Sequence, residues 1–253
     1  MPLDRGAFLI AAAFDPDLDV EREISVLDAL AQGAARRFSD DLEPLAAVNE
    51  LNEYLFDHVC FGGNDADYYD PCNSLLHEVL RRRLGIPITL SVVYIETGRR
   101  LGVPLRGVGM PGHFLVRHDA EPSLYIDPFH RGALLSEEEC AEWLRRTSGP
   151  VRWEPAFLAP VTDRAILARM LRNLSAVWVK RDDAMNAILA LGLLMAVQPE
   201  EAGHWRDRGM LRYKRGDCAL ALEDLERYLD AAFSAPDAWY VRRVIEKIRS
   251  GEG

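Results

Sequence analysis

Cysteine is scarce in this sequence, and the few cysteines present stand far apart. The four lie at positions 60, 72, 140 and 218, and no CxxC pair occurs. Disulfide frameworks and structural zinc sites depend on clustered or regularly spaced cysteines. We therefore expect neither of these, and we expect reduced thiols in a cytoplasmic protein.

Long apolar runs and a surplus of basic residues are absent as well. The apolar stretch near the N-terminus is short and is followed by Asp15 and Asp17, so we expect no signal peptide and no membrane span. With 30 basic and 40 acidic side chains, the formal net charge is −10. Nucleic acids and anionic membranes attract basic surfaces, so we expect no direct nucleic-acid partner and no membrane partner.

Motifs that hold phosphates or metal ions are also missing. The glycine-rich stretch 107–112 leads into a strand-like run, whereas a phosphate-binding loop leads into a helix. Asp65, Asp67 and Asp70 stand at near-alternate positions, but the glycine and terminal glutamate of a calcium loop are lacking. Apart from His113, the histidines are His58, His77, His118, His130 and His204, and none of them shows metal-ligand spacing. We expect no metal and no cofactor.

What the chain does have is helical periodicity, beginning near the N-terminus. Val20 and Ile24 start an apolar face in the segment 19–30. The segment 43–56 repeats this pattern, with Pro44 at its start, where a helix tolerates proline. The sequence therefore predicts helices over both segments.

Two further helices are expected in the middle of the chain. The first, over 75–85, would be capped by Asn73 or Ser74 and ended by Gly85. The second is the apolar segment 88–102, which closes on a glycine.

The hydrophobic period changes after residue 103. Short runs rich in β-branched or alternating residues follow, separated by glycine and proline, as in antiparallel strands. Ser136 and Glu139 then have the spacing of a capping box, which predicts the start of another helix.

The last third of the chain repeats itself. Leu171, Trp205 and Trp239 are 34 residues apart. Three further pairs have the same spacing: Ser175 and Gly209, Ala187 and Ala221, Leu191 and Leu225. This period is typical of the tetratricopeptide repeat (TPR), in which each helix pair buries its apolar face against the next. We predict two TPR-like repeats and a capping helix.

Four motifs connect the chain with a known family. They are NSLL (73–76), GIPITLS (85–91), GVGMPGHFLVR (107–117) and IDPF (126–129). Together they resemble the bacterial SirB-type proteins, which are transglutaminase-like proteins with a C-terminal TPR segment. The resemblance implies an α+β fold in three parts: a helical N-terminal segment (1–60) packing on the core, a transglutaminase-like (papain-like) core with an antiparallel sheet (61–160), and TPR-like helices (161–253).

The resemblance also implies where an active site would lie. Transglutaminase-like enzymes carry a Gly-x-Cys at the start of the core helix, and this chain has Gly85-Ile86-Pro87 there. His113 matches the family's histidine, and Asp127 matches the carboxylate that orients it. The nucleophile's position is thus filled by Pro87, which has no nucleophilic group.

Other residues are candidates to replace the missing thiol. Cys72 precedes a predicted helix, whose N-terminus would lower its pKa, and Thr89 and Ser91 follow Pro87 closely. Each also has a structural interpretation, as an incidental thiol or as a packing or capping hydroxyl. Cys60, Cys140 and Cys218 are expected to be packing residues.

The loop before the predicted helix 75–85 supplies possible binding residues. Tyr68, Tyr69 and Asn73 are expected to line a cleft beside His113 or to cap the following helix.

Two functions from different classes follow. In the first, the chain is a non-catalytic scaffold or regulator that binds a protein or peptide partner in its TPR-like groove. In the second, it is a cysteine or Ser/Thr amide hydrolase or acyltransferase, with His113 as base and Asp127 orienting it.

Overall fold

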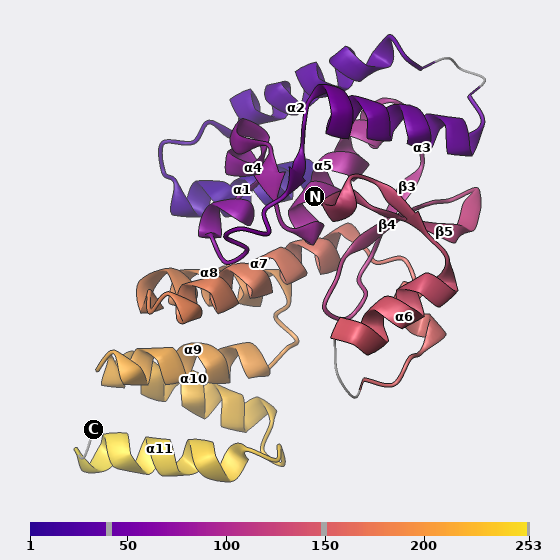
Figure 1. The fold of residues 1–253 in the computed structure, drawn as a ribbon. Helices are drawn as coiled ribbons and strands as arrows, with labels where there is room; N and C mark the ends of the chain where they lie inside the picture. The colour runs from indigo at the N-terminus through magenta and orange to yellow at the C-terminus, as the bar shows by residue number, and fades with distance from the viewer. Residues whose placement is uncertain (39–41, 148–150, 252–253) are drawn as a thin grey trace. The chain divides into compact units, whose positions relative to one another are not determined.

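The computed structural model describes residues 1–38, 42–147 and 151–251 (Figure 1). The chain divides into two compact units, Met1–Met170 and Leu171–Gly253. The division falls inside one helix, and the first 60 residues belong to the first unit.

The N-terminal part of the first unit is helical, as predicted. Its helices are α1 (Leu3–Phe14), α2 (Val20–Ala35) and α3 (Pro44–Asn52), and α3 continues into a π-helical turn, Glu53–His58. The Asp19 carboxylate caps α2 by accepting hydrogen bonds from two backbone N–H groups of its first turn. Pro44 occupies the first turn of α3, where its missing N–H costs nothing.

The core of this unit is built around α5 (Pro87–Arg100). Nearly all of its residues are buried, and they include polar side chains such as Thr89, Ser91 and Glu96 among the apolar ones. Before it come α4 (Leu76–Arg82) and a small parallel pairing of β1 (Gly62–Gly63) with β2 (Leu84–Gly85), which the sequence did not predict.

The predicted ends of α4 are wrong. Leu75 precedes the helix without a side-chain cap, since the Asn73 amide is used to hold the preceding loop. Arg83, in the left-handed region at φ 59°, ends α4, and Gly85 lies in β2.

Four antiparallel strands form the sheet in the order β3-β4-β5-β6. They are β3 (Leu105–Val108), β4 (Leu115–His118), β5 (Glu121–Asp127) and β6 (Ala133–Leu135). Helix α5 packs against β3 and β4, and α6 (Glu137–Thr147) packs against β5 and β6. The predicted capping box at the start of α6 is confirmed: Ser136 N donates to Glu139 Oε2 (2.7 Å), and Glu139 N donates to Ser136 Oγ (3.2 Å).

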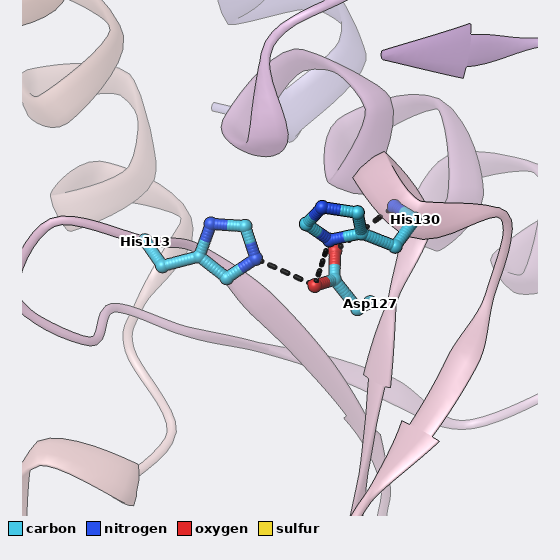
Figure 2. Close-up of side chains that lie close together, drawn as sticks. All are labelled: His113, Asp127 and His130. Atoms are coloured by element: carbon cyan, nitrogen blue, oxygen red, sulfur yellow. Dashed lines mark hydrogen bonds and ion pairs between the residues drawn. The ribbon is translucent and has the colours of Figure 1, made fainter. Parts of the chain in front are cut away.

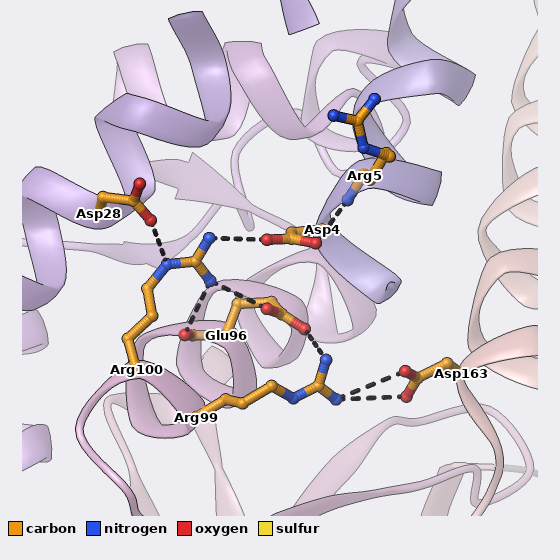
Figure 3. A network of polar contacts seen from close by, with 7 residues as sticks. All are labelled: Asp4, Arg5, Asp28, Glu96, Arg99, Arg100 and Asp163. Carbon is orange, nitrogen blue, oxygen red and sulfur yellow. Dashed lines mark hydrogen bonds and ion pairs between the residues drawn. The ribbon is translucent and has the colours of Figure 1, made fainter. Parts of the chain in front are cut away.

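A charged network ties the N-terminal helices to α5 (Figure 3). Arg100 pairs with Asp4 of α1 (2.6 Å), Asp28 of α2 (2.7 Å) and Glu96 of α5 itself (2.9 Å). Burial raises the pKa of the Glu96 carboxyl, against the opposing effect of Arg99 and Arg100. The network makes the N-terminal helices part of the same packed unit as the core helix.

The second unit consists of antiparallel helix pairs, as the 34-residue period predicted. Its helices are α7 (Asp163–Lys180), whose first half belongs to the first unit, α8 (Ala184–Val197), α9 (Gly203–Lys214), α10 (Cys218–Ala231) and α11 (Ala238–Ser250). A Cβ atom at Gly209 would lie 2.8 Å from the Leu225 side chain, so the repeat needs a small residue there. Asp224 is buried between the helices and pairs with Arg208 and Arg212.

The cysteines differ from expectation at one position. Cys140 is buried, as predicted, in a hydrophobic cluster with residues of the sheet such as Val108, Leu115 and Tyr125. Cys60 is exposed, so the prediction that it packs in the core is wrong; its backbone lies in the left-handed region at φ 65°.

Of the helices in the described residues, none combines the length and the apolar character needed to cross a membrane.

Candidate functional site

The structure brings His113 and Asp127 together at one edge of the sheet (Figure 2). His113 lies in the loop before β4, and Asp127 is the last residue of the neighbouring strand β5. The distance from His113 Nε2 to Asp127 Oδ2 is 2.7 Å, and both side chains are about 3% exposed. The pair thus has the contact by which a carboxylate orients a catalytic imidazole.

Local sequence fixes the Asp127 carboxylate. Pro128 follows it and starts a short 3₁₀ turn, Pro128–His130. Asp127 Oδ1 accepts hydrogen bonds from the backbone N–H groups of Phe129 (3.0 Å) and His130 (3.3 Å). With Oδ1 held in this way, Oδ2 faces His113.

A third side chain, His130, contacts the same oxygen. His130 Nδ1 lies 2.7 Å from Asp127 Oδ2, and the His130 side chain is 54% exposed. The sequence motifs did not identify His130 as a site residue, and its spacing from the other histidines did not indicate a metal ligand. His130 could have been found from its spacing to Asp127, because it follows Asp127 by three residues across a turn that starts at Pro128. Such a turn brings the imidazole next to the carboxylate.

The His113 ring is held from several sides. The Trp143 ring of α6 stacks on it, with ring centroids 4.7 Å apart and an interplanar angle of 29°. Arg169 Nη2 donates hydrogen bonds to the His113 carbonyl (2.7 Å) and to the Met110 carbonyl (2.9 Å), which fixes the loop that carries the histidine.

Charge keeps Asp127 ionised despite its position. Burial alone would raise the pKa of this carboxyl, but the hydrogen bonds from His113 and His130, together with the positive charge of either ring when it is protonated, outweigh burial. The pKa of Asp127 therefore lies below its ordinary value, and the carboxylate is the negative centre of the cluster.

The start of α5 offers no reactive group at the position of the family's nucleophile. Pro87 opens the helix there. Thr89 Oγ1 donates to the Asn73 carbonyl (2.7 Å) and accepts from Ile86 N (3.1 Å), so its hydroxyl serves as a cap. Ser91 is fully buried. Neither hydroxyl forms a hydrogen bond with His113 in the parts of the chain that the structure describes.

Cys72 is not activated where it lies. It is half-buried in a 3₁₀ turn, Pro71–Asn73, beside the Asp70 carboxylate. Burial and then Asp70 raise the pKa of its thiol, the opposite of what a nucleophilic cysteine requires. Within the described ranges it has no hydrogen bond to His113.

The loop residues predicted to bind a ligand have different environments. The Asn73 side chain is fully buried, where it donates to the Asp67 carbonyl (2.7 Å) and accepts from Asn64 Nδ2 (3.0 Å), so it holds the loop. The Tyr68 ring meets the Phe129 ring edge-on at 6.1 Å, which brings it close to the histidines. Tyr69 is exposed and packs edge-on against Tyr68.

The three polar side chains at the sheet edge form a compact donor set. We call His113, Asp127 and His130 the His–Asp–His cluster; their donor atoms all lie within 4.8 Å of one another. Two imidazole nitrogens and one carboxylate oxygen can share protons or can bind a metal ion.

Comparison with known protein families supports the two-part organisation. A family model described as the transglutaminase-like superfamily matches residues 21–172. A tetratricopeptide repeat model matches residues 171–246. The resemblance proposed from the four sequence motifs and the 34-residue period is thereby confirmed.

Individual relatives extend over most of the chain. The UPF0162 protein of Xylella fastidiosa (strain Temecula1) is 38% identical over 238 residues, which cover 90% of this chain and 83% of that protein. The UPF0162 protein of Pseudomonas aeruginosa is 32% identical over 232 residues, with the same coverage. F-box only protein 21 of Mus musculus is 33% identical over 166 residues, which are 61% of this chain but 26% of the mouse protein.

Proposed function

The chain belongs to the UPF0162 family of transglutaminase-like proteins, and we propose that it is a non-catalytic member that binds a protein or peptide partner. On this proposal, the TPR-like helices supply the binding surface, and the His–Asp–His cluster binds a ligand or holds the sheet edge. The observation that carries the proposal is Pro87 at the start of α5, where the family resemblance places the nucleophile.

The surroundings of His113 support a role other than base catalysis. A general base must lie within hydrogen-bonding reach of the group whose proton it takes. Within the described residues, His113 forms no side-chain hydrogen bond with Thr89, Ser91 or Cys72; the side-chain partner of its Nε2 is Asp127. Since Thr89 is used as a cap and Cys72 has a raised pKa, neither is prepared to serve as the nucleophile.

Exposed aromatic side chains support partner binding by the second unit. Phe233, Trp239 and Tyr240 are 74%, 59% and 48% exposed, and they surround the start of α11. The Trp239 and Tyr240 rings touch edge-on, with centroids 5.8 Å apart. Large exposed aromatics are a feature of protein interfaces, and TPR helices commonly receive a peptide or a partner helix.

The use of the same domain in another protein also fits a binding role. The matched region is about a quarter of F-box only protein 21 of Mus musculus, so there it is one part of a larger protein. We propose a regulatory or scaffolding role for this chain. We place this role in the cytoplasm because the four cysteines are free thiols.

The alternative function is that of an amide hydrolase or acyltransferase. The buried contact of 2.7 Å between His113 and Asp127 favours it, because this is the pairing that orients a catalytic base. It requires a cysteine, serine or threonine to approach the imidazole when substrate binds.

Partner binding is tested with the full-length chain as bait. The variant Phe233→Ala/Trp239→Ala/Tyr240→Ala removes the exposed aromatics around α11. The matched control, Leu9→Ala/Val26→Ala/Leu45→Ala, removes three exposed apolar side chains from α1, α2 and α3. We expect a partner that crosslinks to the wild type and to the control, and that is lost at least about tenfold in the aromatic variant. Equal capture by all three proteins, with matching thermal unfolding, would show that this surface is not the binding site.

A further inference from the structure

We propose that the His–Asp–His cluster binds one divalent first-row transition-metal ion, of which Zn²⁺ is the probe ion. The inference rests on the proposed function, because an imidazole nitrogen that binds a metal cannot also accept the proton of a nucleophile. It specifies the ligand that the cluster would take.

The donor types select the class of ion. Two imidazole nitrogens with one carboxylate oxygen form a set used for Zn²⁺ and for non-haem Fe²⁺. Mg²⁺ and Ca²⁺ prefer oxygen ligands and would find one carboxylate here. The cluster should therefore discriminate against these two ions.

The spacing of the donor atoms suits a single ion. Both imidazole nitrogens lie 2.7 Å from Asp127 Oδ2, and all three atoms lie within 4.8 Å of one another. Metal–ligand bonds of about 2.1 Å place ligand atoms about 3.4 Å apart in a tetrahedral site. The required movement is small, and the exposed His130 ring can supply most of it.

The cluster is also preorganised. Two backbone N–H groups hold Asp127 Oδ1. Asp127 Oδ2 is left directed at both imidazoles (Figure 2). Trp143 stacks on His113, and Arg169 fixes the backbone of its loop. Hydrogen bonds to a ligating carboxylate and a rigid apolar shell are the supports that metal sites use around their ligands.

Each ring can present a lone pair to the ion in its neutral form, and a protonated ring releases one proton to solvent when it binds. A neutral imidazole carries its proton on one nitrogen and binds a metal through the other. On binding, the nitrogen of each ring that donated to Asp127 Oδ2 gives up its proton to solvent and binds the ion, and the opposite ring nitrogen carries the one remaining proton. Three protein ligands leave a further coordination position for water or a ligand group.

The test titrates Zn²⁺ into the full-length chain by isothermal calorimetry after removal of metals with EDTA. We expect one bound ion per chain and a loss of affinity of at least about tenfold in His130→Ala and in Asp127→Asn. His130 is exposed, so we expect its removal to leave the fold intact even if Asp127→Asn does not fold. Controls are His58→Ala, an exposed histidine outside the cluster, and Cys60→Ser, which removes an exposed thiol. Both should bind as the wild type does.

Cobalt provides a second readout. Co²⁺ at this site should give a visible absorption band that His130→Ala abolishes and Mg²⁺ does not displace. Zn²⁺ binding that is unchanged in His130→Ala, or that disappears in Cys60→Ser, would overturn the inference. No binding by the wild type would overturn it as well.

The two proposals fail in different ways. If the chain binds no metal at the cluster and an amide-directed electrophile gives no His113-dependent adduct, the metal inference alone is wrong. If such an adduct forms, the non-catalytic proposal is wrong.

Discussion

Two regions of the first unit would have to cooperate in a transglutaminase-like reaction, and they differ in what they retain. At the edge of the sheet, His113 and Asp127 are in contact at 2.7 Å and buried. At the start of α5, Pro87 and the capping hydroxyl of Thr89 occupy the place of the nucleophile. Asp127 also caps the turn that follows it and contacts His130. These contacts stabilise the sheet edge whether or not a reaction takes place there.

The largest loss of stability is expected from a substitution at Asp127. Asp127→Ala removes the acceptor for two backbone N–H groups and two imidazoles, and we expect a loss of about 3 kcal/mol in the free energy of unfolding. Urea unfolding in the presence of EDTA measures it. Asp57→Ala is the control, because Asp57 is an exposed partner of Arg131, and its removal should cost no more than about 0.5 kcal/mol. Equal losses of unfolding free energy in the two variants would show that the contacts of Asp127 do not stabilise the sheet edge.

At the start of α5, two buried hydroxyls distinguish capping from catalysis. Thr89→Val leaves Ile86 N and the Asn73 carbonyl without their partner, so we expect a loss of about 2 kcal/mol in the free energy of unfolding. Ser91 Oγ has no hydrogen-bond partner within the described ranges, so Ser91→Ala should change the free energy of unfolding by less than about 0.5 kcal/mol. Thermal and urea unfolding of both variants decide this. A stable Thr89→Val would remove the argument that this hydroxyl serves as a cap.

The cysteines give a smaller effect that bears on the missing thiol. Burial and Asp70 raise the pKa of Cys72, and burial raises that of Cys140 to about 12. At pH 7.5 we expect iodoacetamide to modify the exposed Cys60 first, Cys72 slower by roughly an order of magnitude, and Cys140 only after unfolding. Peptide mass spectrometry over time gives the order. Cys72 reacting before Cys60 would mark it as an activated thiol.

Much of the fold was predictable because it depends on local periodicity. The helix over residues 19–30, the capping box at Ser136 and the 34-residue repeat each follow from contacts between residues close in sequence or equivalent by repetition. The failures have tertiary causes. Asn73 does not cap α4, since its amide holds the loop from Asn64 to Tyr68. Cys60 is exposed and lies in the left-handed region, a local conformation that its sequence neighbours do not predict.

The candidate site was predictable in part. Family motifs identified His113, Asp127 and the proline at the nucleophile's position, and the structure brings the first two together. His130 was not found, because its approach to Asp127 depends on the 3₁₀ turn started by Pro128. The contacts of Trp143 and Arg169 with the His113 loop come from distant segments, and no spacing in the sequence indicates them.

The central claim is that no side chain is activated by His113, and covalent labelling tests it most directly. The full-length wild type and His113→Ala are incubated with a chloroacetamide peptide and a fluorophosphonate, and adducts are mapped by mass spectrometry, with thermal unfolding confirming that both proteins are folded. The account predicts no adduct whose yield depends on His113. An adduct at Cys72, Thr89 or Ser91 in the wild type that is absent from the folded variant would contradict it.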